Sequence, residues 1–212
     1  LLVDSGRFDW DGPGARGKFP TLTEPYAGFH DMVFAEESTT AAFLLRARRE
    51  GIRDFGACMS PFTAFEILQG IETLPLRMAR HVENARKIVA FLAAHPLVAA
   101  VGYPELPGHP DHALAQRLLP RGCGAVFSFN LAGTRAQGRK FIETLSIFSH
   151  LANVGDAKSL VIHPGSTTHQ QMSAEELTRA GIGEELVRLS IGLEDVTDLT
   201  EDLDHVVRSG QP

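Results

Sequence analysis

The stretch Leu186-Val187-Arg188-Leu189-Ser190-Ile191-Gly192-Leu193 decides the fold of this chain, because apolar residues alternate in it with polar or small ones. One side of the predicted strand carries Val187, Leu189 and Ile191, and the other carries Arg188, Ser190 and Gly192. This period of two is typical of a half-buried β-strand. Asp195 then caps a final helix, whose predicted buried face holds Leu199, Leu203 and Val206.

The segments upstream continue the same mixture of strands and helices. Residues 124–131 alternate, with Phe127, Phe129 and Leu131 opposite Ser128 and Asn130. The other expected elements are a helix over 134–145, strands over 146–154 and 159–163, and a helix that opens at the capping box Ser173–Glu176 and ends at Gly181. This order predicts an α/β chain with an α+β domain, in which helices cover one face of a small, mainly antiparallel sheet.

The first part of the chain reads differently. Residues 5–30 are rich in Gly and Pro and predict an irregular connection, and residues 40–50 predict a helix that ends at Gly51. The Arg46–Arg49 run then lies at the end of that helix, where cations are favourable. Ser60-Pro61 opens a longer helix that Pro75 kinks and His95-Pro96 stops.

The domain boundary is expected within this kinked helix, between Ser60 and Pro96. We predict two domains: residues 1–75 as the remnant of a large domain, and residues 76–212 as a small α+β domain. The apolar, strand-like start at Leu1–Asp4, without an initiator Met, predicts a fragment that begins in mid-element.

Composition excludes several classes of protein. A net charge of −6 and scattered Lys and Arg argue against nucleic-acid binding. No apolar run is long enough to span a bilayer. Cys58 and Cys123 show no disulfide, metal or redox spacing, which favours a reducing, cytoplasmic location.

Few residues predict chemistry by themselves. A guanidinium at Arg188, fixed in direction by its strand, suits a carboxylate, although a solvated strand arginine is the alternative. Asn153 and Ser159 offer polar groups at strand ends, and Thr168 a hydroxyl in a polar loop. His163-Pro164-Gly165 predicts a structural turn rather than a metal site, and none of the four lysines has a setting typical of a Schiff base.

Several motifs resemble one known family, the Cys/Met-metabolism enzymes that depend on pyridoxal phosphate (PLP). Leu186–Asp195, with Asp198-Leu199 and Asp202-Leu203, resembles its C-terminal signature, and Asn153–Leu160, His163-Pro164 and Thr167–His169 resemble the preceding one. Asp54–Met59, Ser60–Phe62, Gln69–Leu74, Arg80–Asn84 and Val3–Trp10 are similar to the O-acetylhomoserine sulfhydrylase branch.

The resemblance implies a fold-type I, aminotransferase-like architecture, a homotetramer, and replacement of the acetyl group of O-acetyl-L-homoserine by sulfide or a thiol. It assigns Arg188 to the substrate α-carboxylate, with Asn153 and Thr168 orienting it. It also implies that PLP is bound mainly by an N-terminal half, so no catalytic, cofactor-binding or metal-binding residue is assigned here, and the chain alone is expected to be inactive. A cystathionine or methionine γ-lyase portion and a non-catalytic interaction domain remain alternatives.

Overall fold

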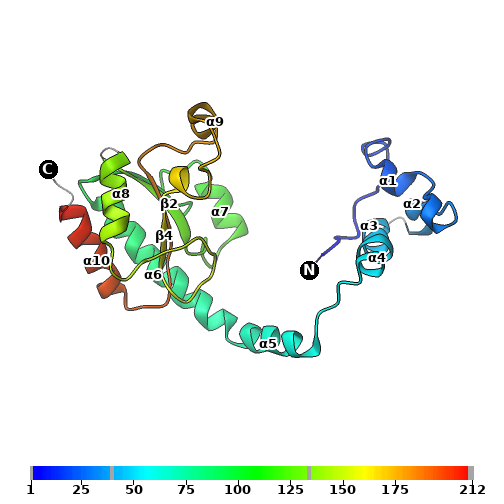
Figure 1. The fold of residues 1–212 in the computed structure, drawn as a ribbon, viewed down its shortest axis with the longest axis horizontal. Helices are drawn as coiled ribbons and strands as arrows, with labels where there is room; N and C mark the ends of the chain where they lie inside the picture. Colours follow the sequence, from blue (N-terminus) through cyan, green and yellow to red (C-terminus); the bar gives the residue numbers. More distant parts are fainter. Residues whose placement is uncertain (1, 39–40, 133–134, 210–212) are drawn as a thin grey trace. The chain divides into compact units, whose positions relative to one another are not determined.

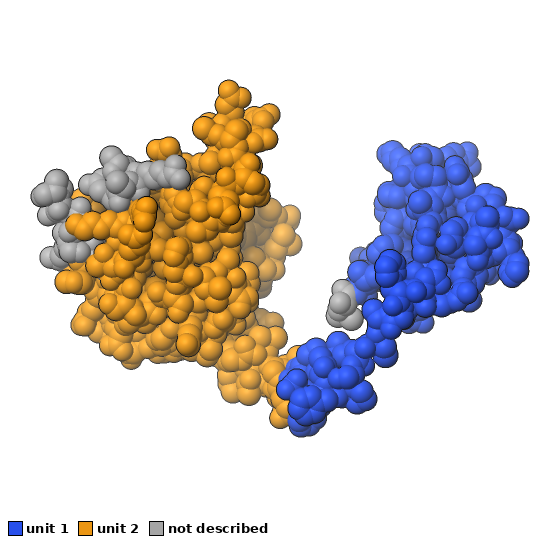
Figure 2. Space-filling model, viewed as in Figure 1, with its two compact units in different colours: residues 1–68 blue, residues 69–212 orange. Residues whose placement is uncertain are grey.

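The computed structural model describes residues 2–38, 41–132 and 135–209, with the side chains of 135–137 and 206–209 left out. The chain forms two compact units, residues 1–68 and 69–212 (Figures 1 and 2). The division lies inside the expected range Ser60–Pro96, while the boundary at 75 stays a prediction. Leu1, Thr40 and Thr134 lie outside the described residues, as does the side chain of Val206.

The second unit holds a five-stranded sheet in the order β1-β2-β5-β4-β3. Its strands are β1 (Val98–Gly102), β2 (Val126–Leu131), β3 (Ser149–His150), β4 (Leu160–Ile162) and β5 (Leu186–Ser190). All neighbouring strands pair antiparallel except β3 and β4, which are parallel. The prediction of a small, mainly antiparallel sheet is therefore confirmed.

Helices cover one face of this sheet (Figure 1). They are α6 (Leu74–Ala94), α8 (Arg135–Thr144) and α10 (Val196–Ser209); α7 (His112–Leu118), η3 (Pro164–Ser166) and α9 (Ala174–Arg179) complete the unit. The core joins the inward side chains of β2 and β5 to the apolar faces of the three covering helices. Val187, Leu189, Ile191, Leu199 and Leu203 are fully buried, as the alternation and the helical spacing predict.

The expected helix ends follow from local chemistry. The helical run is interrupted at Thr73, between α5 (Pro61–Glu72) and α6, with Pro75 in the first turn of α6. The α6 helix stops at His95, before Pro96. Asp195 Oδ1 accepts a hydrogen bond from the amide of Thr197 at 2.8 Å, which caps α10. The capping box at Ser173 and Glu176 is also confirmed.

The first unit is more ordered than the sequence predicts. It contains α1 (Pro20–Thr23), η1 (Ala27–Phe29), α2 (Phe34–Glu37), α3 (Ala42–Arg46), the π-helical segment η2 (Ala47–Ile52) and α4 (Arg53–Phe55). Most of residues 5–30 form turns and irregular backbone, as expected, with the short helices α1 and η1 within them. Aromatic side chains there nevertheless pack into a small core: Trp10 and Phe19 lie 5.2 Å apart, edge to face. Unevenly spaced aromatic residues leave no periodic signal.

The helix expected to end at Gly51 continues instead to Phe55. Gly56, not Gly51, adopts the left-handed conformation, with φ of 66°, that ends a helix. The Arg46 guanidinium pairs with Glu50 at 2.6 Å and lies over the Tyr26 ring. The prediction that this basic run marks a helix terminus is therefore wrong.

Two expected strand features also differ. The strand expected over 146–154 is limited to Ser149–His150. At its start, the Asp202 carboxylate accepts hydrogen bonds from the amides of Ser146 and Ile147 in place of a neighbouring strand. Ser190 and Gly192 are buried rather than open, because the segment around Ala157 and Lys158 covers that end of β5. At the N-terminus, residues 2–4 form no strand.

Candidate functional site

Arg188 lies on the sheet face opposite the covering helices. Its direct partners across the sheet are Ser128 on β2 and Ile162 on β4. The side chains of Val187 and Leu189, on either side of it, are buried in the core. Because successive side chains of a strand point to opposite faces, the half-buried Arg188 side chain extends from the other face of the sheet.

The Arg188 guanidinium contacts the loop that precedes β4. Its Nη2 donates a hydrogen bond to the backbone carbonyl of Asn153 at 3.3 Å. A guanidinium carries several N–H donors in a planar fork, so this one bond orients the group and leaves further donors for an anion. The structure thus brings together two of the three residues that the sequence singles out.

Asn153 contributes its backbone rather than its side chain. Its amide Nδ2 donates to Asp156 Oδ2 at 3.2 Å, and its Oδ1 accepts from the amide of Val154 at 2.8 Å. Hydrogen bonds from the Lys158 amide and from Asn153 lower the pKa of Asp156 below its ordinary value. The ionised carboxylate therefore holds the turn that presents the Asn153 carbonyl.

Hydrogen bonds of Ser159 with Glu194 and Gly192 fix the C-terminal end of the loop that contains Asn153. The Glu194 carboxylate accepts hydrogen bonds from the Ser159 amide at 2.6 Å and from its hydroxyl at 2.9 Å. Ser159 Oγ in turn accepts from the amide of Gly192 at 2.8 Å, and Ser159 is fully buried. Glu194 is thus a structural group here, and Asp195 is the helix cap that the sequence predicts.

Two side chains of α6 form hydrogen bonds with the backbone that follows β5. His81 Nδ1 contacts the carbonyl of Ile191 at 2.6 Å, and Asn84 Nδ2 donates to the carbonyls of Gly192 and Glu194. Both side chains are buried. The sequence reading missed their roles, although a His and an Asn three residues apart on one side of an otherwise apolar helix face were a usable signal.

Thr168 lies apart from this arrangement. It is exposed in the loop after η3, and its Oγ1 is 2.8 Å from Nδ1 of His169. His163 is buried, with one ring nitrogen bonded to Ser166 and the other to the carbonyl of Glu184. This pairing confirms His163 as part of a structural turn.

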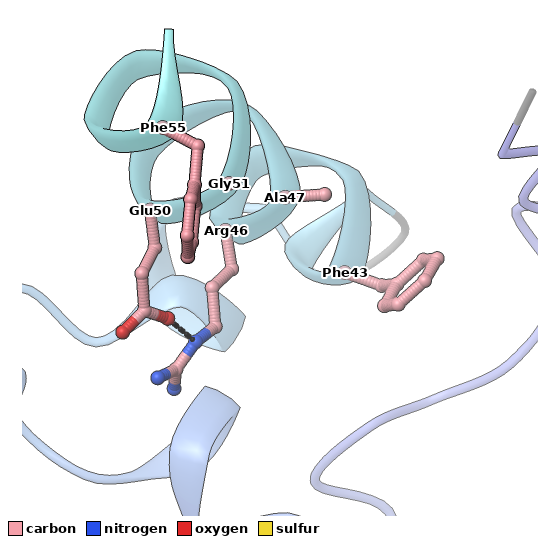
Figure 3. Close-up of a pocket in the computed structure, with 6 residues that line it drawn as sticks. All are labelled: Phe43, Arg46, Ala47, Glu50, Gly51 and Phe55. Carbon is pink, nitrogen blue, oxygen red and sulfur yellow. Dashed lines mark hydrogen bonds and ion pairs between the residues drawn. The ribbon is translucent and has the colours of Figure 1, made fainter. Parts of the chain in front are cut away.

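The hollows among the described residues include three that adjoin titratable side chains. One of about 350 Å³ lies between η3 and α9 and is lined by His163, Gly165, Met172, Leu177 and Glu184, among others. A second, of about 270 Å³, lies beside Arg86, Glu105 and Cys123. The third, of about 330 Å³, belongs to the first unit and surrounds the Arg46–Glu50 ion pair (Figure 3).

The lysines decide whether a Schiff-base cofactor fits this chain. Lys18, Lys87, Lys140 and Lys158 are all exposed, and the amine of Lys87 is paired with Glu83 at 2.7 Å. A Schiff-base lysine needs a desolvated amine, so these side chains do not fit that role. Within the described ranges, no His, Cys, Asp and Glu side chains gather into a group of three that could hold a metal, and no helix is long and apolar enough to cross a membrane.

The comparisons with known proteins agree with this architecture. The family "Cys/Met metabolism PLP-dependent enzyme" matches residues 27–208. The chain belongs to this family of PLP-dependent enzymes.

Particular relatives narrow the likeness. The chain is 47% identical to O-acetyl-L-homoserine sulfhydrylase 1 of Thermus thermophilus, over 95% of this chain and 47% of that protein. It is 45% identical to homocysteine synthase of Schizosaccharomyces pombe, with the same coverage. It therefore spans about half the length of the curated relatives it matches.

Solved structures give the same picture. A structure from Campylobacter jejuni that contains N'-pyridoxyl-lysine-5'-monophosphate matches with a TM-score of 0.80 and 36% identity, over 89% of this chain and 45% of that one. Cystathionine gamma synthase from Xanthomonas oryzae, in complex with cystathionine, matches with a TM-score of 0.69 and 42% identity, over 74% and 40%. The expected fold type is confirmed.

Proposed function

We propose that this chain supplies the substrate-carboxylate side of the active site of a PLP-dependent O-acetyl-L-homoserine sulfhydrylase. The proposed reaction replaces the acetyl group with sulfide or a thiol and gives homocysteine or methionine. The observation that carries the proposal is the half-buried Arg188 guanidinium, which extends from the sheet face opposite the covering helices and is oriented by the Asn153 carbonyl. A planar guanidinium held in this way suits a two-pronged pair with an α-carboxylate.

We assign Asn153 and Thr168 to the same substrate site, although Thr168 lies apart from the other two residues in this structure. Asn153 acts through its carbonyl, which sets the plane of the guanidinium. Thr168 offers an exposed hydroxyl, and its hydrogen bond with His169 would have to break before it could bind substrate. Arg188 is thus the principal binding group, and the other two orient it or the substrate.

The cofactor supplies the electron sink of this chemistry when it is bound. Because the four lysines here are exposed, we assign no cofactor step to this chain and propose that its partner half binds PLP. A cytoplasmic location, supported by the free thiols of Cys58 and Cys123, and a homotetramer as the working assembly belong to the same proposal.

A second candidate function is cystathionine synthesis at the same site, with a different thiol accepting the carbon chain of the substrate. The similarity to a cystathionine gamma synthase favours cysteine as the nucleophile in place of sulfide. A γ-lyase would use no acceptor thiol, and a non-catalytic interaction domain would turn over none of these substrates. The acceptor therefore separates the candidates.

A chimeric enzyme tests the proposal. The matched half of the Thermus thermophilus relative is replaced by this chain, and the product is loaded with PLP. We expect consumption of O-acetyl-L-homoserine that depends on sulfide or methanethiol. Dependence on cysteine would favour the synthase, and turnover without any acceptor would favour the lyase. A folded, PLP-loaded chimera without turnover would reject the three enzymatic candidates and favour the non-catalytic interaction domain.

A further inference from the structure

One turn of α6 donates hydrogen bonds to the backbone that leaves β5. His81 Nδ1 lies 2.6 Å from the Ile191 carbonyl oxygen, and because a carbonyl only accepts, this ring nitrogen carries the hydrogen. Asn84 Nδ2 donates to the carbonyls of Gly192 at 3.1 Å and of Glu194 at 2.9 Å. The two side chains are at most 1% exposed. The α6 helix therefore holds the chain just beyond the strand that carries the proposed binding residue.

The same two side chains also have buried atoms that lack a partner. Among the described residues, His81 Nε2 and Asn84 Oδ1 are buried without a hydrogen bond. A buried polar atom left unpaired costs stability, and its presence in a native structure requires an explanation. Since apolar side chains of similar size would avoid this cost, the donated hydrogen bonds, rather than packing, account for the two polar residues.

The backbone that α6 holds contacts the loop that precedes β4. The Leu193 amide donates to the Ala157 carbonyl at 2.9 Å. The Glu194 carboxylate accepts from the amide and the hydroxyl of Ser159 at 2.6 and 2.9 Å, and Ser159 Oγ accepts from the Gly192 amide. A displacement of residues 191–194 would therefore displace this loop as well.

We propose that His81 and Asn84 are positioning residues of the substrate-carboxylate site. They hold the segment after β5, that segment holds the loop, and the loop presents the Asn153 carbonyl that orients the Arg188 guanidinium. This inference rests on the proposed function, because it assigns the buried polar pair of α6 a part in the affinity for the substrate α-carboxylate.

Steady-state kinetics of the PLP-loaded chimeric enzyme test this role. At saturating sulfide, Asn84→Leu and His81→Leu should each raise KM for O-acetyl-L-homoserine by about three- to tenfold, because each removes hydrogen bonding that orients the binding group. The kcat per bound PLP should stay within about twofold, since a loss of uniform binding raises KM alone. An unchanged KM in either variant would overturn the proposal for that residue.

Val89→Ala is the matched control for a loss of stability. Val89 is buried on the same helix, and its side chain forms no hydrogen bond. This substitution should lower the melting temperature of the chimera and leave KM unchanged. An equal rise in KM for Val89→Ala would show that any weakening of α6 has this effect, and it would overturn the proposal.

A pair of polar variants keeps the test decisive if the leucine variants do not fold. In His81→Asn the amide nitrogen is bonded to Cγ, as Nδ1 of the histidine is, so the donor stays near its place. In His81→Gln the donor lies one carbon further from the backbone. KM should therefore rise for His81→Gln and stay near the unmodified value for His81→Asn. Equal KM values for this pair would contradict the proposal.

A double-mutant cycle shows whether the effect passes through Arg188. Arg188→Lys removes the planar fork whose orientation Asn84 is proposed to set. In that background, Asn84→Leu should lower kcat/KM by less than about twofold more. Equal effects of Asn84→Leu with and without Arg188→Lys would overturn the proposal.

Hydrogen exchange in the 212-residue chain separates this inference from the proposed function. The amides of Ser159 and Gly192, both hydrogen-bonded in this network, should exchange faster in Asn84→Leu, relative to the β2 amides that report global unfolding. Unchanged exchange would reject the inference and leave the proposed function standing. Faster exchange, together with a chimera whose kcat/KM does not depend on Arg188, would instead reject the proposed function.

Discussion

At the scale of single residues, Ser159 connects the proposed substrate site to the core. Its hydroxyl donates to Glu194 and accepts from the Gly192 amide, and it is fully buried. Ser159→Ala would leave the Gly192 N–H buried without its partner, so we expect a loss of about 1–3 kcal/mol in the free energy of unfolding. Urea denaturation measures it. Ser146→Ala, at an exposed serine, is the control and should change stability little.

Glu105 gives a prediction for pH. Burial by itself raises the pKa of Glu105, but hydrogen bonds from Arg86, the Cys123 amide and Tyr103 outweigh it, so the net pKa is lowered. The folded state therefore binds its proton less readily than the unfolded state. The stability that Glu105 contributes is present above the unfolded pKa, about 4.3, and is lost as the pH falls through the folded value.

We accordingly expect Glu105→Gln to be less stable than the unmodified chain at pH 7, with the difference shrinking below about pH 4. Denaturation midpoints across this range measure it. A difference between the two proteins that stays constant with pH would contradict the prediction.

The sequence pattern predicts some contacts of single residues in this site and not others. The alternation of apolar and polar residues was enough to place Arg188 opposite the core. No local pattern could indicate that Asn153 would use its carbonyl, or that Ser159 would meet Glu194, because these contacts join residues about 35 positions apart. Such contacts arise only from the order of the strands.

At the scale of elements, the close passage of two chain segments constrains Gly192. A Cβ atom there would lie 2.5 Å from the Ala157 carbonyl oxygen and 2.6 Å from the Lys158 carbonyl carbon, both backbone atoms. We expect Gly192→Ala to destabilise the chain by about 1–3 kcal/mol and to displace the loop that bears Asn153. Thermal unfolding of the variant measures the first effect.

Gly138, in α8, provides the matched control, because an added Cβ meets nothing within 4 Å. Gly138→Ala should stabilise by about 0.5–1 kcal/mol, through helix propensity. Equal effects of the two substitutions would contradict the account of Gly192.

Elements with strong local signals were predictable from the sequence. The strands β2 and β5 alternate clearly, and Ser173 and Asp195 bring explicit helix caps. The β1 strand, Val-Ala-Ala-Val-Gly, has no alternation and was not identified. The ends of α4 and β3 differ from the predicted ones. Gly56, rather than Gly51, takes the left-handed conformation that ends α4, and the Asp202 carboxylate accepts the backbone hydrogen bonds of Ser146 and Ile147, where the strand was expected to begin.

At the scale of the whole molecule, the family is established, and the activity is a proposal that extends beyond this chain. Since all four lysines are exposed, we expect the purified chain, incubated with PLP, O-acetyl-L-homoserine and sulfide, to form no homocysteine above a protein-free control. Thiol-specific chromatography of the products measures this. Turnover by the chain alone would show that the cofactor half is dispensable.

The central claim is that Arg188 binds the substrate α-carboxylate, and one kinetic comparison tests it most directly. We would measure kcat/KM for O-acetyl-L-homoserine in three forms of the chimeric enzyme. These are the unmodified chimera, the Arg188→Lys variant and, as a control, the Arg179→Lys variant on α9. Loss of a charge-assisted, two-pronged pair predicts a fall of roughly 10- to 100-fold for Arg188→Lys. Arg179→Lys should be unchanged. A kcat/KM for Arg188→Lys equal to that of the control would contradict the claim.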